Sequence, residues 1–169
     1  MTDNFIKLNK NDVLRLKIRT EDGVETGEEL VFDLEDIELP LIYQDMLEGL
    51  KKNTKKLENQ LLIIDKRQDV KGKKLMSKNE EDKIKAFNDF YKEQERLYNM
   101  FLGENGVKKL LNGRKLGWTS LQEIDEIIGK QIMPYIEIDM DNISKKIKDK
   151  YKNDTETEVI KWTILSMQK

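Results

Sequence analysis

The chain has 169 residues with 31 basic and 33 acidic side chains, a formal net charge of -2, and neither histidine nor cysteine. The missing cysteines exclude a disulfide framework, a thiolate nucleophile and thiolate metal ligands. Without histidine, the serines lack the base that most often activates such a nucleophile. The balanced charge shows no basic excess of the kind that a dedicated nucleic-acid binder carries, so nucleic acid is not an expected partner.

Apolar residues make up 37% of the chain and charged residues 38%, against about 45–50% and about 25% in typical soluble domains. This balance favours helices that pack on one face, with a modest core and a large solvated surface. No apolar run approaches the ~20 residues of a membrane span. The first residues, MTDNFIKLNKND, contain no apolar signal segment. We therefore expect a cytosolic protein without a membrane partner or a cofactor.

Two alternating runs near the start predict an antiparallel β-hairpin. Residues 13–20 and 30–34 each place apolar side chains at every second position, which is typical of half-buried strands. The polar segment 21–29 between them contains Asp22-Gly23 and is expected to be the hairpin loop. The inward side chains are expected to be Leu14, Leu16 and Ile18 on the first strand, and Leu30, Phe32 and Leu34 on the second.

Apolar residues then recur every three, four or seven positions from about Leu39 to Asp65, which predicts a long amphipathic helix. Pro40 is tolerated near the start of a helix, and a weak point is expected near Asn53-Thr54. The lysine-rich segment 70–81 has almost no periodicity. It is expected to be a loop and is the best candidate for a mobile segment.

The spacing of Ser77 and Glu80 is that of a capping box, so a second helix is expected to follow and to run to about Leu102. Residues 103–106, Gly-Glu-Asn-Gly, are expected to end it. A short helix over 107–111 follows and is stopped by Asn112-Gly113.

The last long helix is expected to open near Gly117, with Thr119 as its N-cap and Gln122 three residues further on. Pro134 removes one backbone hydrogen bond and is expected to kink this helix. The predicted fold is α+β and mainly α, an N-terminal antiparallel β-hairpin followed by a small helical bundle. The predicted divisions are the hairpin (1–36), a helical domain (37–151) and a C-terminal tail (152–169).

Apolar side chains at two places are candidates for partner binding. The tail is polar up to Glu158 and then carries a short apolar run. An apolar plug on such a tether docks on its own chain or on a partner, and self-docking is slightly favoured. Trp118, beside a helix boundary, is core filler or a second contact. The candidate binding residues are Trp118, Trp162, Ile164 and Leu165.

Two groups of residues are candidates for sites of chemistry. Gly103 and Gly106, followed by two lysines, resemble a phosphate-binding loop, but no Walker signature accompanies them, and a turn is favoured for them and for Gly113. Glu137, Asp139 and Asp141 could hold a divalent cation. No glycine stands at the sixth position of a calcium loop, so a solvated face is favoured. We therefore predict no catalytic, cofactor or metal site.

A Phe/Tyr-rich helix is followed by the turn Phe101-Leu-Gly-Glu-Asn-Gly-Val-Lys-Lys-Leu-Leu-Asn-Gly and then by a helix ending in Lys-Lys-Ile-Lys-Asp-Lys-Tyr. This order of elements, over residues 10–151, resembles that of the tail assembly chaperones of phages and prophages of Gram-positive (Firmicutes) bacteria. The hairpin before residues 32–36, Phe-Asp-Leu-Glu-Asp, is similar to their opening segment. The lysine-rich loop and the Trp162 tail lie outside the pattern.

This resemblance implies a non-enzymatic protein of the host bacterial cytoplasm that binds the tape-measure protein and helps recruit tail-tube subunits. It also leaves room for a homo-oligomer. The alternative is a structural component of a phage or phage-tail-like particle, located in the virion as a tail, baseplate or capsid-associated protein. A third hypothesis, an enzyme acting through Glu137, Asp139 and Asp141, predicts that the chain binds divalent ions.

Overall fold

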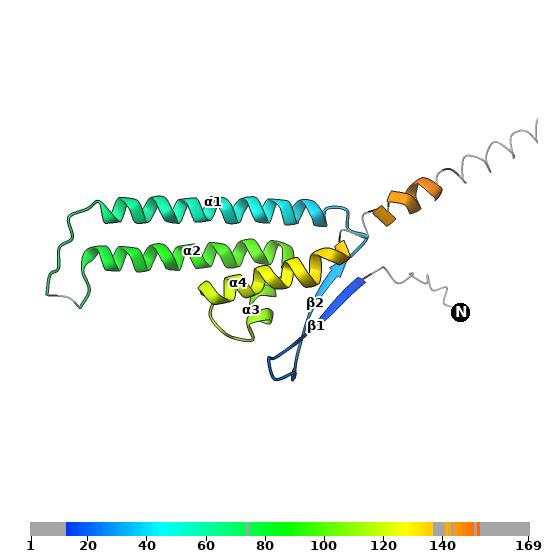
Figure 1. Cartoon of the computed structure of the whole chain (residues 1–169), viewed down its shortest axis with the longest axis horizontal. Helices are drawn as coiled ribbons and strands as arrows, with labels where there is room; N and C mark the ends of the chain where they lie inside the picture. The colour runs from blue at the N-terminus through cyan, green and yellow to red at the C-terminus, as the bar shows by residue number, and fades with distance from the viewer. Residues whose placement is uncertain (1–12, 74, 137–140, 143, 151, 153–169) are drawn as a thin grey trace, which may run out of the picture.

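The computed structural model describes residues 13–73, 75–136, 141–142, 144–150 and 152. Two long helices form an antiparallel hairpin, and the strands and shorter helices gather beside one end of it (Figure 1). The fold is α+β and mainly α, as predicted. The elements in chain order are β1 (Val13–Arg19), β2 (Glu25–Asp33), α1 (Leu39–Asp65), α2 (Lys78–Leu102), α3 (Gly106–Leu111), α4 (Trp118–Ile127) and the π-helical turn η1 (Ile128–Ile132).

The predicted β-hairpin is confirmed, and its two strands pair antiparallel with Leu14 opposite Phe32 and Leu16 opposite Leu30. The loop is shorter than the sequence predicts. It closes over residues 20–24, where the Thr20 carbonyl accepts from the Gly23 amide at 2.8 Å, and Gly23 adopts a φ of +79°, which glycine tolerates without steric cost.

The predicted loop over 25–29 is therefore wrong, because these residues belong to β2. The side chains of this part of β2 are mostly polar and exposed, so apolar alternation does not mark it. Two of them form exposed ion pairs across the strands, Glu29 with Arg15 and Glu25 with Arg19 at 3.1 Å. The register shifts between Lys17 and Arg19. Opposite this shift Gly27 has a φ of +81°, the conformation that a strand irregularity often needs.

Helix α1 has the bounds that its periodicity predicts, but the interruption expected at Asn53-Thr54 is wrong. The Thr54 hydroxyl donates to the Leu50 carbonyl within the helix at 2.9 Å. Asn53 is buried, and its side-chain amide donates to the Phe90 carbonyl of α2 at 3.1 Å. A buried polar group with a partner costs little, so Asn53 joins the two helices instead of breaking one.

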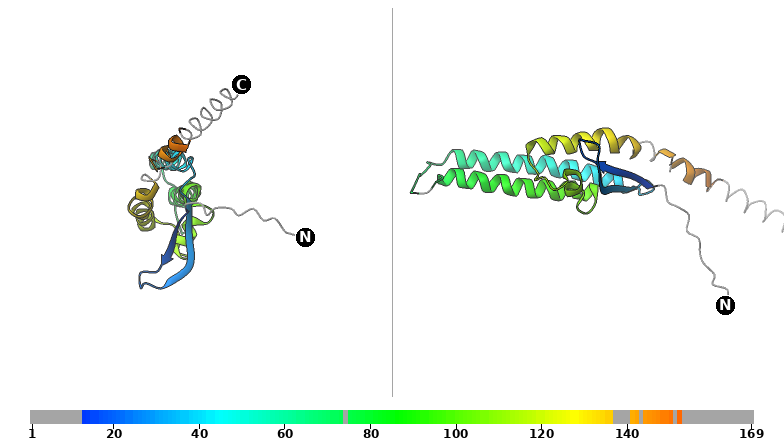
Figure 2. Two further views of the ribbon diagram at one scale, coloured as in Figure 1. Left: turned by 90° about the vertical axis from the view of Figure 1, so that its right-hand side faces the viewer. Right: turned by 90° about the horizontal axis from the view of Figure 1, so that it is seen from below.

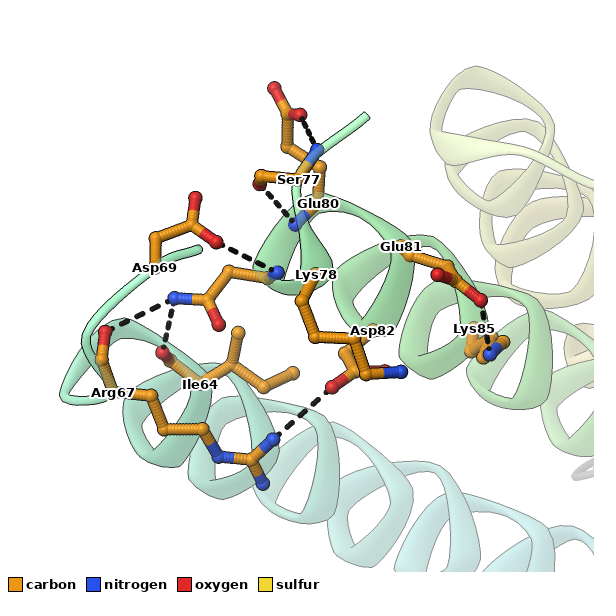
Figure 3. A network of polar contacts seen from close by, with 10 residues as sticks. Ile64, Arg67, Asp69, Ser77, Lys78, Glu80, Glu81, Asp82 and Lys85 are labelled. Atoms are coloured by element: carbon orange, nitrogen blue, oxygen red, sulfur yellow. Dashed lines mark hydrogen bonds and ion pairs between the residues drawn. The ribbon is translucent and has the colours of Figure 1, made fainter. Parts of the chain in front are cut away.

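A capping box starts α2, as predicted. The Ser77 hydroxyl accepts from the Glu80 amide at 3.2 Å, and the Glu80 carboxylate accepts from the Ser77 amide at 2.7 Å (Figure 3). Residues 78–81 are therefore helical, and the loop is shorter than the predicted 70–81. Asn79 fixes the two helix ends to each other, because its side-chain amide donates to the carbonyls of Ile64 at 3.1 Å and Arg67 at 3.2 Å.

Charged side chains reinforce this junction. Asp82 pairs with Lys78 at 3.0 Å and with Arg67 of the loop at 3.1 Å, and the Lys78 hydrogen bond is the main reason that the pKa of Asp82 is lowered. The pKa of Asp69 is also lowered, first by a hydrogen bond from the Ser77 side chain and then by one from the Asn79 amide. The tip of the helical hairpin is thus held by polar contacts (Figure 3).

The main core lies where the β-hairpin meets the helices. The Phe101 ring of α2 packs against Phe32 of β2, with centroids 5.5 Å apart, and against Tyr43 of α1 at 5.2 Å. The strands and helices therefore share one core. Its other fully buried members include Leu30, Met46, Leu97, Val107, Leu111, Ile124, Ile128 and Ile132.

Two details of the last helix differ from the prediction. The N-cap is Gly117 and not Thr119, because the first helical bond runs from the Leu121 amide to the Gly117 carbonyl at 2.9 Å. The Ser120 hydroxyl accepts from the Gly117 amide at 2.7 Å and satisfies this backbone donor. Before Pro134, the helix widens into η1, where the Met133 amide donates to the Ile128 carbonyl five residues back. The irregularity associated with Pro134 is therefore a π-helical turn, a common way for a helix to accommodate a local mismatch.

Candidate protein-binding face

Helix α2 carries two apolar stripes. Ala86, Phe90, Leu97 and Phe101 form the stripe that packs on α1. Ile84, Phe87, Tyr91 and Tyr98 are separated by three, four and seven residues, so they share a second face of the helix. One part of this second stripe is covered by other elements of the fold, and the other part is exposed.

The part of the second stripe near the β-hairpin is covered by α4 and η1. Tyr98 is buried, and its hydroxyl donates to the Asp125 carboxylate of α4 at 2.6 Å. Burial and this hydrogen bond raise the pKa of Tyr98 well above its ordinary value. Ile124 and Ile128 belong to the same buried cluster as Tyr98, so α4 is a third helix seated on the α1–α2 hairpin.

The part near the tip is uncovered. Helix α4 begins about half-way along α2, so the α1–α2 hairpin extends well beyond it (Figures 1 and 2). Ile84 is 55% exposed and Phe87 40% exposed, while Tyr91 is half-buried at the boundary. We call Ile84, Phe87 and Tyr91 the distal stripe. Burying a large apolar side chain stabilises by about 1.5–3 kcal/mol, a gain that Ile84 and Phe87 do not fully realise in this chain.

More apolar side chains are exposed around the tip. The buried cluster beneath it is small, comprising Leu57, Ile64 and Ala86. Leu75, in the loop, is 93% exposed. Exposed apolar side chains therefore gather in sequence around the tip, which makes the tip a candidate interaction site. The other exposed apolar residues here are Leu62, Ile63, Val70 and Met76.

The opposite side of the α1–α2 hairpin is polar. Arg96 lies about two and a half turns beyond Phe87 at 3.6 residues per turn, so the two side chains point in opposite directions. Arg96 pairs there with Glu93 at 2.7 Å. The shallow hollow on that side is bordered by Lys52, Lys56, Asp89 and Lys92. The side chains that border this hollow are thus mainly charged, in contrast to the distal stripe.

Of the predicted binding residues, Trp118 lies in the described part of the chain. It is the first residue of α4 and is 68% exposed, so it is not core filler. Helix α4 therefore begins at Trp118, and this end of α4 is the one that points toward the tip of the α1–α2 hairpin (Figure 1). The other three candidates, Trp162, Ile164 and Leu165, lie outside the described residues.

The three glycines of the turn motif have the predicted structural role. Gly103 ends α2 with a φ of +87°, and Gly113 follows α3 with a φ of +81°, both in the region that favours glycine. A methyl group on Gly106 would lie 2.4 Å from Cβ of Leu102, so close packing requires glycine there. The Asn99 side chain accepts from the Val107 amide at 2.9 Å. This backbone amide in the first turn of α3 therefore already has a hydrogen-bond partner within the chain.

The carboxylate cluster falls mostly outside the described residues, which include Asp141 but neither Glu137 nor Asp139. Within the part of the chain that the structure describes, no group of three acidic, histidine or cysteine side chains is placed to hold a metal ion. The same part of the chain contains no helix that is both long and apolar enough to span a bilayer.

Sequence reasoning missed one surface hollow, of about 890 Å³, between the β-hairpin loop, α3 and α4. Its lining mixes charges of both signs, and Arg114 and Glu123 within it pair with each other at 2.9 Å. Residues as distant as Arg19 and Glu126 meet there, so no local pattern announces it. No nucleophile with an activating base is present among its lining residues.

Comparison of the chain with protein-family models, with curated proteins and with solved structures finds no match. The geometry of the described residues and the sequence resemblance are therefore the grounds for a functional proposal.

Proposed function

We propose that this chain is a non-enzymatic protein that works by binding another protein, and that it serves as a phage tail assembly chaperone. Its client would be the tape-measure protein, and it would help recruit tail-tube subunits. The observation that carries the proposal is the uncovered distal stripe, together with the exposed apolar residues around the tip. The identity of the client comes from the resemblance of the turn motif over residues 101–113.

The shape of the chain supports a binding role. The β-hairpin, α3 and α4 form the main core at one end, while the α1–α2 hairpin projects beyond it with an apolar side (Figure 1). A rigid arm of this kind presents an apolar surface without exposing the core that holds the fold. Binding through it needs no cofactor and no reacting group.

Co-expression tests the proposal. The tape-measure protein of the phage or prophage that encodes this chain is expressed with and without it, and the soluble fraction of the client is measured. We expect the client to be mostly insoluble alone and to co-purify with the chain when both are present. An equally insoluble client in both cases would refute the chaperone function.

Fractionation separates this function from its alternative. A chaperone leaves its client during assembly, so the chain should be absent from purified particles. A stoichiometric amount of the chain in those particles would instead identify it as a structural component of the tail, baseplate or capsid.

A further inference from the structure

We propose that the distal stripe receives a single amphipathic helix of a partner protein, which lies along α2 in line with α4. This inference rests on the proposed protein-binding function and names the kind of partner segment that the site accepts. It concerns the second stripe of α2, in which Gln94 and Glu95 separate the exposed distal stripe from Tyr98, where α4 packs.

The covered half shows what fits the stripe. The buried residues that α4 and η1 contribute to the core are Leu121, Ile124, Ile128 and Ile132, spaced by three or four residues. On the other side of Gln94 and Glu95, apolar residues recur on this face at a spacing of three or four residues, at Tyr91, Phe87 and Ile84. A second helix with leucine or isoleucine at i, i+3 or i+4 and i+7 therefore continues an interface that already exists in the fold.

The width of the stripe favours one helix over a second copy of the hairpin. Polar groups border it on both sides: Lys83, paired with Asp65 of α1, and the exposed Asn88. A second hairpin laid face to face would bury these groups along with the stripe, and buried charges are costly unless their partners are ideally placed. One helix contacts the apolar row and leaves the borders in water.

The length of the stripe sets the length of the partner segment. From Ile84 to Tyr91 the helix rises by roughly 10 Å at 1.5 Å per residue, which corresponds to two turns of a partner helix. Trp118 is exposed at the start of α4. In the proposed arrangement the incoming helix ends near the start of α4, so Trp118 serves as its fluorescent reporter.

The probe is a synthetic peptide with the sequence of residues 119–136, because the apolar side chains of this segment are buried in the same cluster as Tyr98. A Trp162→Phe chain leaves Trp118 as the one tryptophan of the two. We expect added peptide to shift Trp118 emission to the blue with saturable binding, and a peptide carrying Ile124→Asp and Ile128→Asp to have no effect. Hydrogen exchange should slow over residues 84–91 and stay unchanged in α4.

Charged substitutions in the chain locate the binding surface. Phe87→Glu should weaken peptide binding at least tenfold, and so should Ile84→Glu, a second variant in case the first is poorly folded. Leu41→Glu is the matched control, because Leu41 is equally apolar and 62% exposed on α1; it should bind the peptide as the parent does.

Four results would overturn the inference: no binding of the peptide, binding that Phe87→Glu and Ile84→Glu leave intact, faster exchange in α4 that reveals displacement, or a dimer that these variants dissociate. The last result would identify a second copy as the occupant. Failure of the proposed function is distinguishable, because the peptide would then bind at the distal stripe while no tape-measure protein is kept soluble.

Discussion

The hydrogen bond from Tyr98 to Asp125 fixes the third helix on the α1–α2 hairpin, and Tyr98→Phe removes it while keeping the ring. Tyr98 is 2% exposed, and its hydroxyl lies 2.6 Å from the carboxylate oxygen. A hydrogen bond to a charged group contributes about 1.5–3 kcal/mol. Because Asp125 itself is exposed, we expect a loss near the lower end, about 1.5 kcal/mol. At about 2–4 °C per kcal/mol for a chain of this size, Tm should fall by roughly 3–6 °C.

The same residue predicts a pH dependence. Burial, and then the bond to Asp125, raise the pKa of folded Tyr98 above its ordinary value of 10.0. The unfolded chain therefore ionises first, so the contribution of Tyr98 is complete below pH 10 and is lost as the pH rises further. Urea unfolding of the parent should show stability falling above about pH 10, and Tyr98→Phe should fall less steeply. An unchanged Tm at pH 7 with identical alkaline slopes would refute the role assigned to this bond.

Thermal and urea unfolding test three further predictions. Gln94→Leu should raise stability by about 1 kcal/mol, because the Gln94 carbonyl oxygen is buried without a partner among the described residues; a loss would mean that this oxygen is satisfied. Ser77→Ala should cost about 1 kcal/mol by removing the capping box, and an unchanged Tm would show that the box is dispensable. Gly49→Ala should cost about 1–2 kcal/mol, because its methyl would lie 2.5 Å from Cδ2 of buried Leu97. Gly129→Ala, which meets nothing within 4 Å, is the matched control and should gain up to ~1 kcal/mol.

Local patterns in the sequence predict much of the fold. The bounds of α1 and the end of α2 follow from apolar periodicity, and the start of α2 follows from Ser77 and Glu80. The expected N-cap at Thr119 is wrong because the helix begins one residue before it: the Leu121 amide already donates to the Gly117 carbonyl at 2.9 Å, which places Thr119 inside the first turn.

The candidate site was less predictable. The periodicity of α2 includes both apolar stripes, but which part of the second stripe stays exposed depends on where α4 packs, and α4 comes from a distant part of the chain. Tyr98 and Phe87 look alike in the sequence, yet one is buried against Asp125 and the other is 40% exposed. Sequence reasoning selected Trp118, but it supplied no reason to connect Trp118 with Ile84 or Phe87.

The central claim is that the distal stripe is the surface that binds the client. The most direct measurement is the fraction of tape-measure protein kept soluble by co-expressed chains carrying no substitution, Phe87→Glu or Leu41→Glu. Circular dichroism first establishes that all three chains are equally folded. We predict that the parent and Leu41→Glu keep the client soluble and that Phe87→Glu does not. Equal protection by all three chains would contradict the claim.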